Sequence, residues 1–321
     1  MRGPFDRRRW LVLAAAALFV IASTAVSVQE TMSEEPWSHG GIAGTLARPA
    51  KGPARGPAVL LLAGSGGSPR DGSFGTLRQI AEGLAAAGIR SLRYDKRGVG
   101  ESRALVTRED DLTFDLYVDD AAAAARELAG RSEVSSVVIA GHSEGALLAI
   151  LAAAKVPAAG IVSLAGTGRK LDAVLREQLQ NIPAPEPLRS EAFQILDRLA
   201  AGERVSEVPR PHWPLFRPSV QPFLLSVFAV DPGAALARVT VPVLVVSAGR
   251  DLQVTRADFD LLTRAKPNAR TLVLPDANHV FKLAPADLSN REAQLKSYDP
   301  AAPLVPALVP ALIDFVRSVA R

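Results

Sequence analysis

One short segment places a serine between two glycines, in the order Gly141-His142-Ser143-Glu144-Gly145. The apolar run "VSSVVIA" leads into this segment, and the apolar run "ALLAILAAA" follows it. A serine on a tight turn between a strand and a helix is held above a sheet as a nucleophile. Both glycines are needed for steric reasons, because the strand and the helix pass close to their neighbours there. We therefore predict nucleophilic catalysis by Ser143.

An acid and a histidine follow this serine in the chain order that such a site requires. Asp251 comes directly after "PVLVVSAGR", and His279 lies in "LPDANHVFK", beyond the last predicted strand. A serine hydroxyl becomes strongly nucleophilic when a neutral imidazole takes its proton, and a carboxylate fixes the tautomer of that imidazole. We predict that Ser143, Asp251 and His279 form a catalytic triad.

Other acids and histidines fit these roles less well. We expect Asp258 to face outward from the helix after the strand, and Asp276 to shape the loop before His279. The remaining histidines lie in a linker, beside the serine and in a helical insertion, at His39, His142 and His212. The alternative interpretation of His279 is a loop histidine that bonds only to backbone.

Such a reaction also needs donors for the oxyanion that develops on the attacked carbonyl. We predict that one donor is the backbone N–H of Glu144, at the start of the helix, where the dipole also favours negative charge. The other is predicted in the glycine-rich loop "AGSGGSPRDG", at the N–H of Ser65, with Gly66 as second choice. A phosphate-binding loop is disfavoured, because neither G-x-x-x-x-G-K-[ST] nor G-x-G-x-x-G is completed there.

The segment "YDKRGVGES" is predicted to support the site rather than to react. Asp95 ends a strand, and we expect it to pair with Arg97 and hold the loop beside the nucleophile. Ser102 is a possible decoy nucleophile, but it lacks the setting between a strand and a helix. The sequence shows no cluster of side chains at metal-ligand spacing and contains no cysteine, so we predict neither a metal site nor a cofactor.

These residues need a rigid sheet to position them. Short apolar runs alternate with helical stretches from about residue 41, which is typical of an α/β fold with a mostly parallel sheet flanked by helices. Several predicted strands are continuously apolar, as expected for strands that are buried on both faces. The six predicted strands are "PAVLLLAG", "IRSLRYD", "SSVVIAGH", "GIVSLAG", "PVLVVSAG" and "RTLVLPD".

Residues 167–231 break this alternation. They contain helical stretches followed by a segment rich in proline and aromatic residues, and no strand is predicted among them. We expect them to form a helical cap inserted in a domain that spans residues 41–321. The predicted pocket for an apolar substrate contains residues of the cap and of the catalytic loops, namely Gly66, His142, Trp213, Phe216, Phe223 and Phe228. The alternative is that the aromatic residues only attach the cap to the core.

The composition excludes some partners. The chain has 321 residues, 48% of them apolar, and this is enough for one large core. Its net charge is +4, but the first nine residues supply +3 of it. The remainder of the chain is therefore nearly neutral, and we predict no nucleic acid partner.

The first 28 residues read as a targeting segment, with arginines followed by the apolar stretch 11–28. They are predicted to be a signal peptide or an N-terminal membrane anchor, with residues 29–40 as a polar linker. Either case predicts a periplasmic or secreted enzyme, or one held at the membrane by residues 11–28.

Taken together, the chain from about Gly41 resembles the α/β-hydrolase superfamily, and within it the serine-aminopeptidase-like branch of esterases and acyl hydrolases. The resemblance rests on "LLLAGSGG", "RDG", "LRYDKRGVGES", "GHSEGA", "LAGTGR", "SAGRDLQV" and "NHVFK". It implies Ser143 as nucleophile, Asp251 as acid and His279 as base, with an oxyanion hole at Ser65 and Glu144. The chain departs from that branch at Gly67 and Pro69, where proline and an acidic residue are usual.

We predict from these features the hydrolysis of a small acyl ester through an acyl-serine intermediate. Two alternatives remain open. The same triad serves an aminopeptidase or amidase, and the same fold also serves as a binding module without catalysis.

Overall fold

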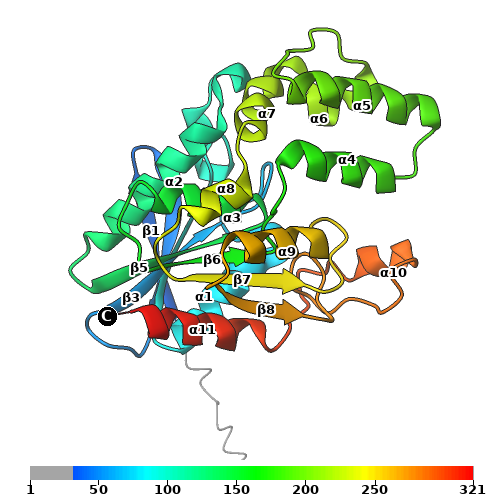
Figure 1. Cartoon of the computed structure of the whole chain (residues 1–321). Coiled ribbons are helices and arrows are strands. Elements are labelled where there is room, and N and C mark those ends of the chain that lie inside the picture. Colours follow the sequence, from blue (N-terminus) through cyan, green and yellow to red (C-terminus); the bar gives the residue numbers. More distant parts are fainter. Residues whose placement is uncertain (1–31, 321) are drawn as a thin grey trace, which may run out of the picture. The chain divides into compact units, whose positions relative to one another are not determined.

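Eight strands form one sheet in the order β1-β2-β4-β3-β5-β6-β7-β8 (Figure 1). The computed structural model describes residues 32–320. The strands are β1 Met32–His39, β2 Ile42–Pro49, β3 Gly56–Leu62, β4 Arg90–Tyr94, β5 Val134–His142, β6 Gly160–Leu164, β7 Val243–Ala248 and β8 Arg270–Leu274. Strand β2 pairs antiparallel with both β1 and β4, and all other neighbouring pairs are parallel. The α/β fold with a mostly parallel sheet is confirmed.

The six predicted strands correspond to β3 to β8. Alternate side chains of β3 enter two separate apolar clusters, because successive residues of a strand point to opposite faces. Leu60 packs with helices of one face, and Leu61 packs with helices of the other. Burial on both faces explains why β3 and the other central strands β5, β6 and β7 read as continuous apolar runs.

Helices cover both faces of the sheet (Figure 1). One cluster contains residues of α1 and α11, and the other contains residues of α2, α3, α8 and α9. These helices are α1 Thr76–Ala86, α2 Phe114–Ala129, α3 Glu144–Ala153, α8 Pro232–Ala237, α9 Arg256–Ala265 and α11 Leu308–Val319. The catalytic residues predicted above lie at the ends of the strands β5, β7 and β8 or in the loops that follow them. Because these strands are parallel, their ends lie at one edge of the sheet.

The segment between β6 and β7 is helical, as the sequence predicts. It contains α4 Leu171–Asn181, α5 Glu186–Ala200, α6 Trp213–Phe216 and α7 Gln221–Phe228, which stand together at one end of the sheet (Figure 1). A further helix, α10 Arg291–Lys296, follows the loop that carries His279. The sequence analysis assigned no helix there.

The prediction of a linker over residues 29–40 is wrong for Met32–His39, which form β1 at the edge of the sheet. Most of its side chains are exposed and only Trp37 is buried, so the strand lacks an apolar pattern. Backbone pairing with β2 and the contact of the Trp37 ring with Tyr94 hold it in place.

The targeting segment predicted at residues 1–28 lies outside the described residues, and its export or anchoring role stays a prediction. Within residues 32–320, no helix is both long and apolar enough to cross a membrane.

Candidate active site

Ser143 occupies a strained turn between β5 and α3. Its backbone has φ 55° and ψ −120°, a conformation that costs a side-chain-bearing residue free energy. The turn is fixed on both sides, because Ser143 N–H donates to Leu164 O at 2.8 Å and Ala146 N–H donates to Ser143 O at 2.9 Å. The side chain is partly exposed at the end of the strand, as a nucleophile must be.

The two glycines that flank this turn meet the backbone of other residues. A Cβ at Gly141 would lie 1.8 Å from Gly145 O, and a Cβ at Gly145 would lie 2.4 Å from Leu62 O of β3. Neither contact is possible, since real Cβ atoms do not approach backbone atoms under 3.0 Å. The steric requirement for glycine at both positions is therefore confirmed.

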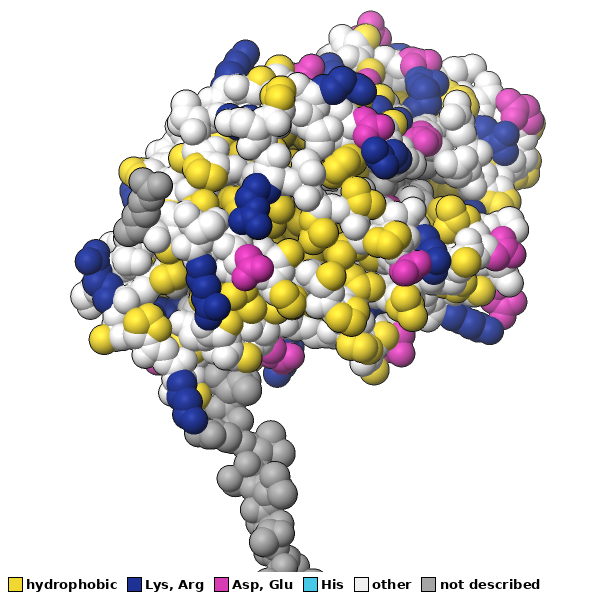
Figure 2. Space-filling view, turned by 60° about the horizontal axis from the view of Figure 1, so that its bottom comes forward, with side chains coloured by type: hydrophobic (Ala, Val, Ile, Leu, Met, Phe, Trp, Pro, Cys, Tyr) yellow, Lys and Arg dark blue, Asp and Glu magenta, His cyan; other side chains and the backbone are white. Residues whose placement is uncertain are grey.

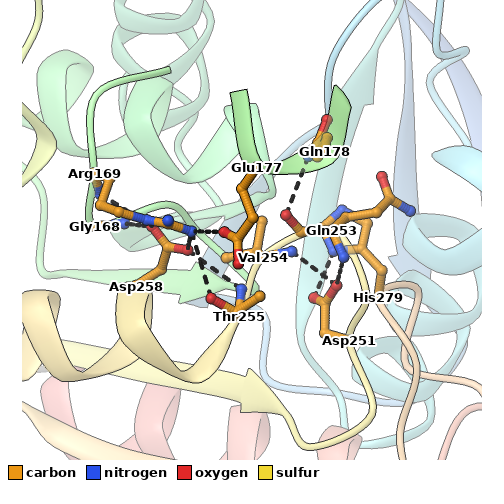
Figure 3. A network of polar contacts seen from close by, with 10 residues as sticks. All are labelled: Gly168, Arg169, Glu177, Gln178, Asp251, Gln253, Val254, Thr255, Asp258 and His279. Atoms are coloured by element: carbon orange, nitrogen blue, oxygen red, sulfur yellow. Dashed lines mark hydrogen bonds and ion pairs between the residues drawn. The ribbon is translucent and has the colours of Figure 1, made fainter. Parts of the chain in front are cut away.

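Asp251 and His279 are joined directly. Asp251 Oδ2 accepts a hydrogen bond of 2.6 Å from His279 Nδ1–H, and both side chains are buried (Figure 3). Asp251 Oδ1 accepts from the backbone N–H groups of Gln253 and Val254 at 2.7 and 2.9 Å. Both oxygens of the carboxylate are thus bonded. Within residues 32–320 the other ring nitrogen of His279, Nε2, has no hydrogen-bond partner, as the predicted role of a base requires.

The backbone places His279 next to the serine turn. His142, the neighbour of Ser143, bonds through Nε2–H to His279 O at 2.8 Å, and the centres of the two rings are 4.8 Å apart. Among the described residues, no hydrogen bond joins Ser143 Oγ to His279. Catalytic hydrogen bonds of this kind often form only when substrate is bound.

The rival acids have other partners. Asp258 was expected to face outward, but it is fully buried and its carboxylate accepts from Arg169 at the base of the insertion (Figure 3). The error has a local cause, because Asp258 is the third residue of α9 and folds back into a capping box with Thr255. Asp276 pairs with Arg250 near the protein surface.

The backbone groups predicted for the oxyanion hole lie at the same edge of the sheet. A Cβ at Gly64 would lie 3.3 Å from Ser143 Cβ, so the glycine-rich loop contacts the nucleophile turn. Among the described residues, the N–H groups of Ser65 and Glu144 donate to no acceptor. Ser65 is exposed in this loop, and Glu144 is the first residue of α3, where helical N–H groups lack partners.

A buried lysine joins the two segments that carry these donors. Lys96 Nζ lies 2.5 Å from Gly64 O and 3.1 Å from Glu144 Oε1, and both charged side chains are almost fully buried. The ammonium also lies 5.0 Å from the centre of the Tyr117 ring. The sequence analysis missed this residue, although it stands inside the "YDKRGVGES" segment.

The ion pair predicted between Asp95 and Arg97 is wrong, because both residues have other partners. Asp95 accepts from the backbone N–H of Arg70 at 2.9 Å and from its guanidinium at 2.6 Å, and so anchors the glycine-rich loop. Arg97 instead forms two hydrogen bonds with Asp120 of α2. The decoy Ser102 is buried, and its hydroxyl accepts from the backbone of Ala43.

Known proteins share the sequence features of this arrangement. The sequence model of the alpha/beta hydrolase family matches residues 59–291, which include the serine, the acid and the histidine described above. The chain belongs to the alpha/beta hydrolase family. The resemblance inferred from the sequence motifs is thereby confirmed.

Relatives of this α/β hydrolase include named enzymes. Over 261 residues it is 31% identical to Esterase EstD of Thermotoga maritima, a match that covers 78% of this chain and 61% of that protein. The structure of Est1E from Butyrivibrio proteoclasticus with bound ferulic acid is similar at a TM-score of 0.61 and 16% identity, covering 88% of this chain and 98% of that one. Proline iminopeptidase of Mycobacterium smegmatis is similar at a TM-score of 0.55 and 18% identity, covering 89% and 98%. The two structural similarities show the fold alone.

A large groove lies beside the site in this hydrolase. Its volume is about 770 Å³, and α4, α10 and the loop after Asp251 contribute to its walls. Figure 2 shows apolar side chains gathered on the face below the insertion. None of the predicted pocket residues lines this groove. His142 is buried against His279, Gly66 is exposed in its loop, and Phe216 is buried with the residues of α5 and α7.

The pocket prediction therefore needs correction for the aromatic residues. Trp213 is half-exposed on the insertion, and its indole N–H donates to Val208 O. Phe223 packs edge-on against Phe114 and Tyr117 of α2, so it attaches the insertion to the core. Phe216 and Phe228 are buried, whereas Trp213 is half-exposed but does not line the groove.

The loop that carries His279 is held by a residue that the sequence analysis did not single out. The buried Asn278 accepts from the N–H groups of Val280 and Lys282 and donates to Ser297. Its position directly before the predicted base His279 was the available signal. Residues 32–320 contain no cluster of three or more His, Cys, Asp or Glu side chains that could hold a metal ion.

His142 gives this hydrolase a testable acid sensitivity. Burial lowers its pKa to about 3, since the charged imidazolium would lose its hydration there. Between pH 6.5 and 3 the unfolded chain takes up a proton at this position that the folded chain does not. The free energy of unfolding should therefore fall as pH falls, by about 1.4 kcal/mol per pH unit from this residue alone.

We expect His142→Gln to make this decline shallower by about that amount, because an amide can still donate to His279 O without titrating. Urea unfolding at pH 7, 5.5 and 4 would measure it in both proteins. If the free energy of unfolding falls with pH equally steeply in both proteins, the prediction is contradicted.

Proposed function

We propose that this α/β hydrolase cleaves carboxylic esters through an acyl-serine intermediate on Ser143. The observation that carries the proposal is the 2.6 Å hydrogen bond between Asp251 and His279 beside a strained, partly exposed serine. Its family membership and its similarity to a protein named as an esterase support the same activity. The chain spans 61% of the length of that relative, so the activity is proposed here rather than transferred.

The proposed reaction assigns one task to each group. His279 Nε2 takes the proton of Ser143 Oγ as the oxygen attacks the ester carbonyl, and Asp251 stabilises the imidazolium that forms. The N–H groups of Ser65 and Glu144 stabilise the oxyanion. The imidazolium then protonates the leaving alcohol, and water attacks the acyl-serine with His279 again as base.

The helical segment α4 to α7 is proposed to act as a cap over this site. Two hydrogen bonds support the proposal. Gln178 of α4 donates from its side-chain amide to Gln253 O at 3.1 Å, and Gln253 N–H donates to Asp251 (Figure 3). The cap therefore touches the loop that carries the catalytic acid.

A matched pair of substrates tests the proposed reaction against its alternatives. We expect the purified protein to hydrolyse p-nitrophenyl acetate and to leave alanine p-nitroanilide nearly untouched. A fluorophosphonate probe should label it, and mass spectrometry should place the adduct on Ser143. Faster cleavage of the anilide would indicate an aminopeptidase or amidase. Absence of both labelling and turnover would indicate a binding module.

A further inference from the structure

The exposed apolar side chains of this protein are concentrated at one place. Among the described residues, eight large apolar side chains are exposed, and five of them line the groove beside the active site: Phe74, Ile182, Leu252, Leu288 and Leu295. Exposing large apolar groups to water is unfavourable, so a concentration of them in a concave site indicates a binding function.

The groove lies on the histidine side of the site. Leu252 and Gln253 follow Asp251 directly, and Asp251 supports the imidazole of His279. Tyr298 also lines the groove, and its side-chain hydroxyl lies 3.5 Å from the side-chain amide nitrogen of Gln253. Leu288 and Leu295 belong to the segment that comes after the His279 loop in the chain.

The direction of proton transfer decides which part of an ester faces this side. When the C–O bond of the tetrahedral intermediate breaks, His279 Nε2 gives its proton to the departing oxygen, and a neutral alcohol is released. The alcohol oxygen must therefore be next to the imidazole, while the carbonyl oxygen points to the N–H groups of Ser65 and Glu144. The alcohol portion of the substrate thus extends toward the histidine side.

We infer that the groove binds an apolar alcohol portion of the ester, such as a medium-length alkyl chain or a single aromatic ring. This inference rests on the proposed function. The groove has the volume of an ordinary small-molecule site. Two hydrogen bonds also join its walls, because Arg291 Nη1–H donates to Asn181 O and the Gln178 side-chain amide donates to Gln253 O, both at 3.1 Å.

Two series of esters test the assignment. The first keeps the acetyl group and lengthens the alcohol from methyl to octyl, and the second keeps ethanol and lengthens the acyl group. We expect kcat/KM to rise at least about tenfold from methyl to butyl acetate, since burial of each methylene contributes about fourfold. The acyl series should show no comparable rise. A rise in the acyl series alone would overturn the inference.

Variants connect this preference to the groove. We expect Leu288→Gln and Leu295→Gln to remove most of the rise in the alcohol series, measured as the ratio of kcat/KM for butyl acetate to kcat/KM for methyl acetate within each protein. Both side chains are exposed, so folding should be little affected. Leu283→Gln is the matched control, because Leu283 is about as exposed as Leu295 but does not line the groove. If kcat/KM rises with the length of the alcohol as steeply in both groove variants as in the wild-type protein, the assignment is contradicted.

A binding measurement separates this inference from the proposed function. Calorimetric titration of Ser143→Ala with 1-butanol and 1-octanol requires no turnover. Tighter binding of octanol that is lost in Ser143→Ala/Leu295→Gln supports the groove assignment even if the wild-type protein hydrolyses no ester. Equal affinities for the two alcohols overturn it even if esters are hydrolysed.

Discussion

Ser143→Ala is expected to lower kcat for p-nitrophenyl acetate by about 10⁶-fold, which leaves only the catalysis supplied by binding and the oxyanion donors. The reason is chemical, because no other oxygen at the end of β5 can form the acyl intermediate. The variant should also fail to react with a fluorophosphonate probe. The backbone of residue 143 keeps its unusual φ in either protein, so circular dichroism and thermal unfolding should remain close to wild type.

Ser102→Ala provides the matched control for this prediction. Ser102 is the other serine that a motif suggested, but it is buried and bonded to the backbone of Ala43. We expect this variant to lose some stability and to keep its reaction with the probe. Turnover near the wild-type rate, or labelling of Ser143→Ala by the probe, would instead show that a different residue is the nucleophile.

Asp251→Asn should lower kcat by about 10⁴-fold with little change in the fold. The asparagine oxygen can still accept from the N–H groups of Gln253 and Val254, so the loop keeps its hydrogen bonds. Its amide nitrogen would then face His279 Nδ1. A donor at that position forces the imidazole proton onto Nε2, and a protonated Nε2 cannot accept a proton from Ser143.

The control is Asp276→Asn, because Asp276 is the neighbouring carboxylate whose partner is Arg250. We expect it to keep nearly wild-type kcat. NMR of the imidazole nitrogens would show whether the tautomer changes in Asp251→Asn. A large loss of activity in Asp276→Asn, with none in Asp251→Asn, would exchange the roles of the two acids.

The sequence predicted the fold best for strands that are buried on both faces of the sheet. The central strands β3, β5, β6 and β7 could be predicted because continuous apolar runs are needed when both faces of a sheet are covered. Strands β1 and β2 were not predicted. The side chains of β1 contact mainly water, and the strand is held by backbone pairing with β2 and by the buried ring of Trp37. Helix α10 was also missed, since its six residues give too short a pattern to show a helical period.

The site shows the same limit. Ser143, Asp251 and His279 could be proposed from chain order, because each follows a recognisable strand. The partners of Asp95 and Asp258 could not, since both carboxylates bond to arginines brought close only by folding. The groove depends on α4 and α10 meeting across the active site, and no local pattern in either segment indicates that meeting.

The buried ion pair of Lys96 and Glu144 restricts which amino-acid substitutions the protein tolerates. Replacing either residue alone would leave one charge buried without its partner, at a cost of about 3–5 kcal/mol. Replacing both with apolar residues of similar volume avoids that cost. We therefore expect substitutions at positions 96 and 144 to occur together, and directed libraries that vary the residue after Ser143 to recover more folded protein when both positions vary together.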